Sequence, residues 1–337
     1  MEKNEFQFTN FKIHSQFSIC EGAVKIDDLA KYCKENKIKA VGLCDSNNLC
    51  GALEFAEKIS KVGTHPLIGS QINFKINDTI AKLPIFAKTE KGYRNLTRLS
   101  STSYLDIDGT TDPYCKLSQL FDNSEGLIVL SGGVRDLFGS LFKLNKISLL
   151  KKIFKELSDN FKDNFYFEIQ RHNEDSEKDF EAFLISQSLE INLPLLASQE
   201  IFYISKEMAE AHDALICIGE KRFVDENNRI KYQNNHHIKN TSDLEKIYED
   251  IPEALENNYN FPKKFSFKPK KTKPKLPNII LEKNHNVDSE LFLQANKGLN
   301  NRLENYIFIK NKNMNKDEIK NVYNDRLNHE INIIKSM

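Results

Sequence analysis

Side chains able to bind a metal or move a proton follow short apolar runs at several points of the first two hundred residues. They are His14, Asp45, Glu168, His172 and Glu200. In a parallel α/β barrel the carboxyl ends of the strands meet at one mouth, so imidazoles and carboxylates placed there could converge on a divalent metal. Taken singly, a His or Asp at a strand end is more often a turn or helix-cap residue. The pattern therefore raises a metal site as a hypothesis and does not establish one.

The elements that would position these side chains alternate between strand and helix. Strands are predicted at 11–14, 40–44, 66–76, 83–87, 126–131, 164–169 and 194–197, and helices at 26–36, 51–62, 90–101, 146–161 and 175–189. Repeated strand–helix units predict a parallel sheet. The absence of a Gly-rich phosphate loop favours a closed barrel over an open nucleotide-binding sheet, with His14, Asp45 and Ser131 near one mouth. The adjacent His236 and His237 lie among polar neighbours and are interpreted as surface residues.

A change of composition divides the chain. Residues 262–277 hold four of the nine prolines and seven lysines, which interrupts both helix and sheet and predicts a domain boundary. A solvated linker is favoured over a DNA contact as the explanation of these lysines. The helices predicted at 288–304 and 317–335 are too few to bury their apolar faces, so they are expected to begin a second domain that continues beyond this chain.

The overall composition limits the class of protein. The 337 residues are 39% hydrophobic and 28% charged, which suits a globular fold with a core. The charges balance at 48 basic and 48 acidic residues, which argues against a protein that coats nucleic acid. The sequence shows no signal peptide and no apolar run of membrane-spanning length, and no CxxC pair occurs among the six cysteines. A cytoplasmic protein with reduced thiols is predicted.

Longer stretches resemble the alpha subunit of bacterial DNA polymerase III. These stretches follow the family's order and include KIHSQFSICEG, GALEF, EKGYRNLTRLSS, GLIVLSGG, FYFEIQRH, LPLLASQEIFYI and AEAHDALICIG. The resemblance implies an α/β fold: a PHP domain over residues 1–265, built as a distorted (β/α)7 barrel. It also implies a linker at 262–277 and an incomplete, mostly helical start of the polymerase palm at 278–337. DNA-templated DNA synthesis is the implied activity of the whole protein. Its Mg²⁺ ions are expected at carboxylates downstream of Met337, so neither a catalytic residue nor a bound cofactor is expected in this chain.

The same resemblance implies that the metal site of the PHP domain has decayed. Among the family's ligand positions, only His14, Glu21 and Glu200 could still bind a metal. The positions where the family has His, Glu or Cys ligands now hold Lys12, Ser46, Gln71, Lys82, Gly133 and Phe202. The two lysines would repel a metal from a site of low effective dielectric. We therefore expect a retained fold without its metal chemistry.

The resemblance also implies partners. They are a proofreading exonuclease subunit, other subunits of the polymerase III holoenzyme and, for the full-length protein, primer–template DNA. No membrane partner is expected. A free-standing PHP phosphoesterase is the alternative function, and the missing ligands and the helical region after residue 277 count against it. A scaffold that docks another replication protein is compatible with the main interpretation.

Overall fold

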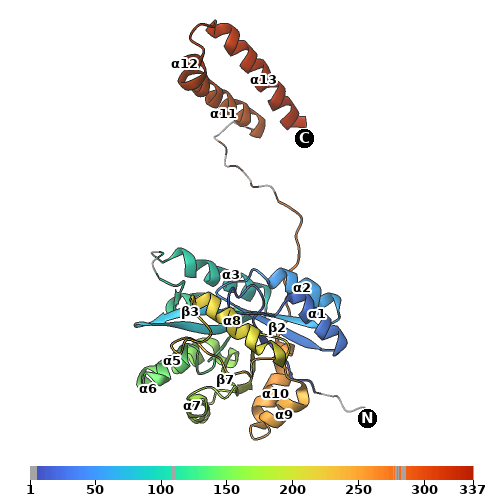
Figure 1. Cartoon of the computed structure of the whole chain (residues 1–337), viewed down its shortest axis with the longest axis vertical. Coiled ribbons are helices and arrows are strands. Elements are labelled where there is room, and N and C mark those ends of the chain that lie inside the picture. Colours follow the sequence, from blue (N-terminus) through green and yellow to red (C-terminus); the bar gives the residue numbers. More distant parts are fainter. Residues whose placement is uncertain are drawn as a thin grey trace. The chain divides into compact units, whose positions relative to one another are not determined.

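The computed structural model describes residues 6–107, 109, 111–275, 277, 279, 281 and 286–336. The chain divides into two compact units, Met1–Lys271 (unit 1) and Thr272–Met337 (unit 2), which are shown in Figure 1. The division falls within the stretch 262–277. The first part of that stretch packs on unit 1, where Phe265 is buried and Lys268 Nζ donates to Ser60 Oγ at 2.8 Å. Over the described residues, none of the helices combines the length and the apolar character needed to cross a bilayer.

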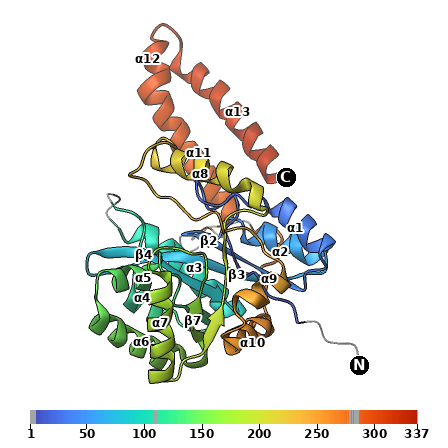
Figure 2. The ribbon, with the colours of Figure 1, turned by 60° about the horizontal axis from the view of Figure 1, so that its bottom comes forward.

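The strands of unit 1 form a curled main sheet and a separate two-stranded sheet (Figure 2). They are β1 (Lys12–Ile13), β2 (Ala40–Ser46), β3 (His65–Ile76), β4 (Thr79–Ala87), β5 (Cys115–Lys116), β6 (Leu127–Leu130), β7 (Phe165–Ile169), β8 (Leu195–Ala197) and β9 (Glu200–Ile201). The main sheet has the order β2-β3-β4-β6-β7-β8, with β5 beside β3, and β1 pairs in parallel with β9. Gly42 N donates to Asn10 O at 3.0 Å, which brings the segment leading into β1 against β2.

The expectation of an all-parallel sheet is wrong at β4. This strand runs antiparallel to both β3 and β6, while β2–β3, β6–β7 and β7–β8 are parallel. Only Asn77 and Asp78 separate β3 from β4, and Asn77 has a φ of 53°. A link this short makes a hairpin, because a parallel crossover needs a dozen or more residues.

Helices flank the curled sheet on its outside. Those of unit 1 are α1 (Ile26–Glu35), α2 (Ala52–Lys61), α3 (Glu90–Leu105), α4 (Leu117–Asp122), α5 (Leu137–Lys143), α6 (Ile147–Phe161), α7 (Glu177–Ile191), α8 (Ala209–Glu220), α9 (Thr241–Ile247) and α10 (Pro252–Asn260). In Figure 1, α1 to α3 lie along one side of the sheet and α5 to α7 along the opposite side. The predicted helices over 26–36, 51–62, 90–101, 146–161 and 175–189 correspond to α1, α2, α3, α6 and α7.

The interior of the curled sheet is filled by one side chain cluster to which six strands of the sheet contribute. Its members are Phe11, Ala40, Cys44, Leu67, Phe86, Ile128, Leu130, Tyr166, Leu196, Phe261 and Phe265. Phe261, which follows α10, lies with its ring centroid 4.6 Å from that of Phe11 and 5.8 Å from that of Phe86. The outward side chains of the same strands, such as Leu43 and Ile85, pack instead in separate clusters with the helices. This alternation fixes which face of each strand looks into the barrel.

Unit 2 is a small helical element. It contains α11 (Val287–Arg302), a π-helical turn (Leu303–Ile307), α12 (Phe308–Lys310) and α13 (Lys316–Ser336). Asn286 caps α11 by accepting a hydrogen bond from Ser289 N at 2.8 Å. The small core of this unit contains Leu303, Phe308 and Ile319.

Candidate functional site

A buried ammonium lies among carboxylates at the mouth of the barrel. Lys12 Nζ donates to Asp136 Oδ2 at 2.7 Å and lies 3.5 Å from Glu200 Oε1 and 3.7 Å from Glu168 Oε1. The side chains of Lys12 and Glu168 are both fully buried. Glu200 Oε1 also accepts from Gln71 Nε2 at 2.8 Å and lies 3.1 Å from His14 Nε2. We call Lys12, Asp136, Glu168 and Glu200 the Lys12 cluster.

The pKa shifts follow from this crowding. Burial by itself disfavours the ammonium, but the three carboxylates outweigh it and raise the pKa of Lys12 well above its usual value. Burial likewise opposes ionisation of Glu200, yet Lys12 and His14 hold the pKa of this carboxyl well below its ordinary value. Burial, with help from the other two carboxylates, raises the pKa of Asp136 to about 6 against the attraction of Lys12. At neutral pH the Lys12 ammonium and the Glu200 carboxylate are therefore both charged.

A second lysine is paired next to this cluster. Lys82 Nζ donates to Glu21 Oε1, and Glu21 Oε2 accepts from Ser46 Oγ at 2.5 Å. Burial opposes the charge of Glu21, but Lys82 and His14 lower the pKa of this carboxyl below its ordinary value. Glu21 is thus engaged with a protein cation, and among the described residues no hydrogen bond or ion pair joins it to the Lys12 cluster.

Strand alternation explains which candidate residues meet and which do not. Ser46 shares the interior face of β2 with Cys44, whereas Asp45 lies on the outward face with Leu43. The Asp45 carboxylate accepts from Ser15 N, Ser15 Oγ and Ser18 Oγ at 2.6–2.8 Å, and so fixes the loop after β1. Ser131 Oγ accepts from Glu168 N at 2.9 Å. The structure therefore gives Asp45 and Ser131 hydrogen-bonding roles within the fold.

Two further positions, Gly133 and Phe202, which the resemblance predicts to have lost metal ligands, are enclosed by neighbouring side chains. A Cβ at Gly133 would lie 2.2 Å from Gln170 Oε1, so the Gln170 amide occupies the space of a side chain at that position. Gln170 Nε2 in turn donates to Glu168 Oε1 at 2.7 Å. Phe202 lies between His14 and His212, with ring centroids 4.7 and 5.1 Å away. The ring of Phe202 and the amide of Gln170 thus fill the space at these two positions.

The interpretation of His236 as a surface residue is wrong. His236 is 1% exposed and stacks on His172 with the ring centroids 4.0 Å apart, while His237 is half-buried. His236 Nδ1 donates to Glu200 O at 3.0 Å, and Phe202 N donates to His236 O at 3.0 Å. His172 Nε2 accepts from Glu200 N at 3.0 Å. His172 and His236 are buried against each other because the segment that carries His236 pairs with the chain that continues from β9.

The segment that carries His236 lies beside the Lys12 cluster, where Tyr232 lines the same pocket as Asp136 and Glu200, and we call residues 231–238 the strap. Arg135 donates to Glu174 Oε2 at 2.5 and 2.9 Å and to Lys231 O at 2.6 Å. Its guanidinium also lies 4.5 Å from the centroid of the Tyr232 ring. Glu174 Oε1 lies 3.3 Å from His236 Nε2, so Arg135 and Glu174 together fasten both ends of the strap.

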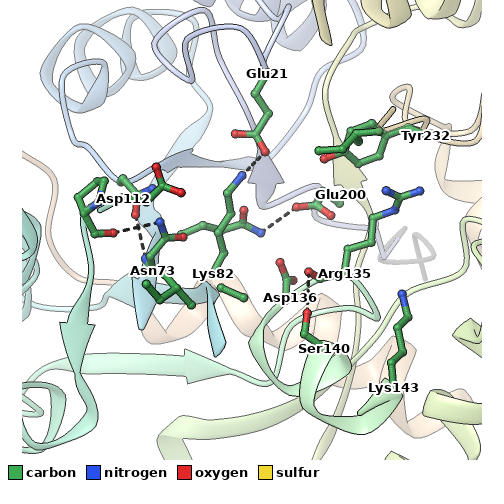
Figure 3. A pocket seen from close by; sticks show the side chains of 16 residues that line it. Glu21, Asn73, Lys82, Asp112, Arg135, Asp136, Ser140, Lys143, Glu200 and Tyr232 are labelled. Atoms are coloured by element: carbon green, nitrogen blue, oxygen red, sulfur yellow. Dashed lines mark hydrogen bonds and ion pairs between the residues drawn. The ribbon is translucent and has the colours of Figure 1, made fainter. Parts of the chain in front are cut away.

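A pocket of about 620 Å³ opens beside the strap and the Lys12 cluster (Figure 3). In Figure 3, Lys82 and Glu21 point toward each other, and Arg135, Lys143 and Tyr232 lie on the opposite side. Asp136 and Glu200 line the pocket as well. The pocket therefore has charges of both signs, and most of them are already paired within the protein.

The residues present do not fit the metal cluster that the family resemblance implies. Among the residues that the structure describes, no group of three or more His, Cys, Asp or Glu side chains is arranged to hold a metal ion. Of the retained candidates, His14 and Glu200 are in contact while Glu21 is paired with Lys82. The Lys12 ammonium lies 2.7 Å from Asp136 and occupies the space that a metal ion would need. Its positive charge would also repel such an ion.

Sequence reasoning missed Asp136 and the Arg135–Glu174 pair. Both Arg135 and Asp136 lie shortly after β6, so the rule that found the other strand-end residues could have found them. Within the SGGVRD sequence, only Ser131 and Gly133 were predicted to lie at the site. Nothing in the sequence marks Glu174 as a partner of Arg135, because these residues come from different loops.

Comparison with known proteins supports the resemblance. A family model described as the PHP domain matches residues 10–172. The chain is 32% identical over 98% of its length to the DNA polymerase III subunit alpha of Caulobacter vibrioides and covers 29% of that protein. It is 30% identical over 98% of its length to the same subunit of Rickettsia felis and covers 28% of that protein. A solved structure of a candidate metal-dependent phosphoesterase from Bifidobacterium adolescentis is similar at a TM-score of 0.40 and 11% identity, covering 57% of this chain and 86% of that one.

The residues matched by the PHP model include the strands β1 to β7 of unit 1. The chain spans less than a third of the length of the curated relatives that it matches. Residues 10–172 match the PHP domain, and 98% of the chain is similar to curated proteins named DNA polymerase III subunit alpha.

Proposed function

We propose that this chain is the amino-terminal part of a replicative DNA polymerase, acting in DNA-templated DNA synthesis in the cytoplasm. The observation that carries the proposal is the match to alpha subunits over 98% of this chain. Unit 1 is its PHP domain and unit 2 the beginning of its palm region. The polymerase reaction would need Mg²⁺ ions to activate the primer 3′-hydroxyl and stabilise the leaving pyrophosphate, and none of the described residues of this chain is proposed to hold them.

This chain by itself is expected to extend no primer. Its described residues present no carboxylate cluster suited to a pair of magnesium ions. Primer extension with Mg²⁺ and all four nucleotides is the measurement, and the full-length alpha subunit of Caulobacter vibrioides is the positive control. Template-dependent extension by the purified chain would contradict this assignment.

The PHP domain is proposed to act as a metal-free scaffold. Lys12 and Lys82 supply positive charge beside Asp136 and Glu21, and the ring of Phe202 fills a further ligand position. These contacts count against the alternative of a free-standing PHP phosphoesterase, which needs its metals to activate water.

Elemental analysis of the dialysed protein should therefore find well under one zinc or manganese ion per chain. Phosphodiesters and DNA 3′ ends should remain intact in its presence. Two or more tightly held metal ions together with 3′-exonuclease activity would mean that the ligand positions have been assigned wrongly.

The second part of the proposed role is docking of a separate proofreading exonuclease subunit. Large apolar side chains are exposed between residues 218 and 230: Ile218 (69%), Phe223 (75%), Val224 (53%) and Ile230 (45%). Exposed apolar surface of this kind marks interaction sites. A rigid barrel beneath it lowers the ordering cost of binding a partner.

Calorimetry with the exonuclease subunit of the same organism should give micromolar or tighter binding to this chain. Phe223→Asp should weaken that binding about tenfold or more, because it places a charge in an apolar contact. Leu189→Asp is the matched control, since Leu189 is 83% exposed on α7 and lies outside the 218–230 segment. Binding to the full-length polymerase but not to this chain would move the docking site elsewhere and leave the barrel a structural support.

A further inference from the structure

The Lys12 ammonium has the surroundings of a bound cation. Its three carboxylate neighbours come from separate segments: Asp136 precedes α5, Glu168 lies in β7 and Glu200 begins β9. Lys12 itself belongs to the two-residue strand β1, which pairs only with β9 in the sheet. Backbone pairing already joins β1 to β9 at Glu200, so the ammonium adds the links from β1 to Asp136 and to Glu168 in β7.

The side chains in and beside the Lys12 cluster include hydrogen-bond acceptors that no neighbouring donor or cation satisfies among the described residues. Glu168 Oε2 and Gln71 Oε1 are buried without a hydrogen-bond partner among the described residues. Gln71 donates its amide to Glu200, which fixes the identity of the two amide atoms and leaves the oxygen as the free acceptor. Buried acceptors of this kind are costly unless a donor or a cation reaches them.

We propose that Lys12 is a built-in replacement for a metal ion, and that removing its ammonium uncovers a latent site for one divalent cation. The inference rests on the proposed metal-free state of the PHP domain. The donors left behind are the carboxylates of Asp136, Glu168 and Glu200, with His14 Nε2 beside them. Carboxylate oxygens and an imidazole suit Mn²⁺ or Zn²⁺, whose ligands lie at about 2.0–2.2 Å. The native contacts at 2.7–3.7 Å are those of an ammonium, so the carboxylates draw inward once the lysine side chain is gone.

The test compares the 337-residue chain with Lys12→Ala, by thermal unfolding in EDTA and in Mn²⁺ or Zn²⁺ and by calorimetric titration of each metal. The native protein should melt at the same temperature in each condition. Lys12→Ala should melt well below it in EDTA, regain about 5 °C or more with metal, and bind one ion per chain. Adding Asp136→Asn to Lys12→Ala should abolish the gain.

Lys82→Ala is the matched control, because Lys82 pairs with Glu21 and lies outside the Lys12 cluster. It should show no metal-dependent gain. Lys12→Gln keeps a polar side chain of similar length and serves if Lys12→Ala does not fold. The inference is overturned if neither Lys12 variant gains stability from a divalent ion, whether the variants fold without it or fail to fold with it. Metal bound by the native protein would instead defeat the proposed metal-free scaffold, so the two failures are distinguishable.

Discussion

Gly42→Ala is expected to lower the stability of unit 1 by about 3 kcal/mol or more, with little soluble protein recovered. Gly42 lies on the interior face of β2, where the chain leading into β1 passes directly over it. A Cβ at this position would lie 2.3 Å from Phe11 O and 2.5 Å from Phe11 Cα. Both are backbone atoms, so no side chain rotation can relieve the contact. The strand β1, and Lys12 with it, would have to move away from β2.

Urea denaturation followed by circular dichroism measures the effect. Gly298→Ala is the matched control, since nothing lies within 4 Å of a Cβ built there in α11. That change should leave unit 1 unaffected and favour the helix of unit 2 by about 0.5–1 kcal/mol. An unchanged urea midpoint for Gly42→Ala would show that β1 does not press on β2 in solution.

Arg135→Ala is expected to release the strap while the barrel stays folded. The guanidinium contacts Glu174, Lys231 O and the Tyr232 ring, so its removal leaves a nearly buried carboxylate and a carbonyl short of donors. A third of the Arg135 side chain is exposed, so solvent screens part of this loss. About 2 kcal/mol remains for local opening, which corresponds to about a thirtyfold loss of protection.

Hydrogen exchange of the amides of Gln233 and Ile238 reports this opening. Gln233 N donates to Glu174 Oε1 and Ile238 N donates to Ile204 O, and both hydrogen bonds hold the strap in place. Amides of β3 and β7 should keep their protection. Arg94→Ala removes an exposed helical ion pair with Glu90 and should change neither set. Unaltered exchange in the strap of Arg135→Ala would place its anchorage with His236 and the pairing to β9 alone.

The sequence by itself determined most of the elements of unit 1. Apolar alternation and helical periodicity placed the strands at β2, β3, β6, β7 and β8 and the helices between them to within a few residues. Period-two alternation also carries the face of each strand: Gln71 shares its face with Leu67, and Glu168 shares its face with Tyr166. These signals are local, because they depend on residues two to four positions apart.

Only the tertiary structure decided which of these side chains meet. Asp136 reaches Lys12 across 124 positions of sequence, and Glu200 reaches it from β9 at the other end of unit 1. The hairpin that turns β4 antiparallel and the burial of His236 within the strap were likewise not predicted. In each case the partner is chosen by sheet order and chain crossing, and a long-range contact leaves no periodic trace in a single sequence. The sequence therefore predicted that ligand positions had been replaced, and the fold showed that the Lys12 ammonium lies among the carboxylates of Asp136, Glu168 and Glu200.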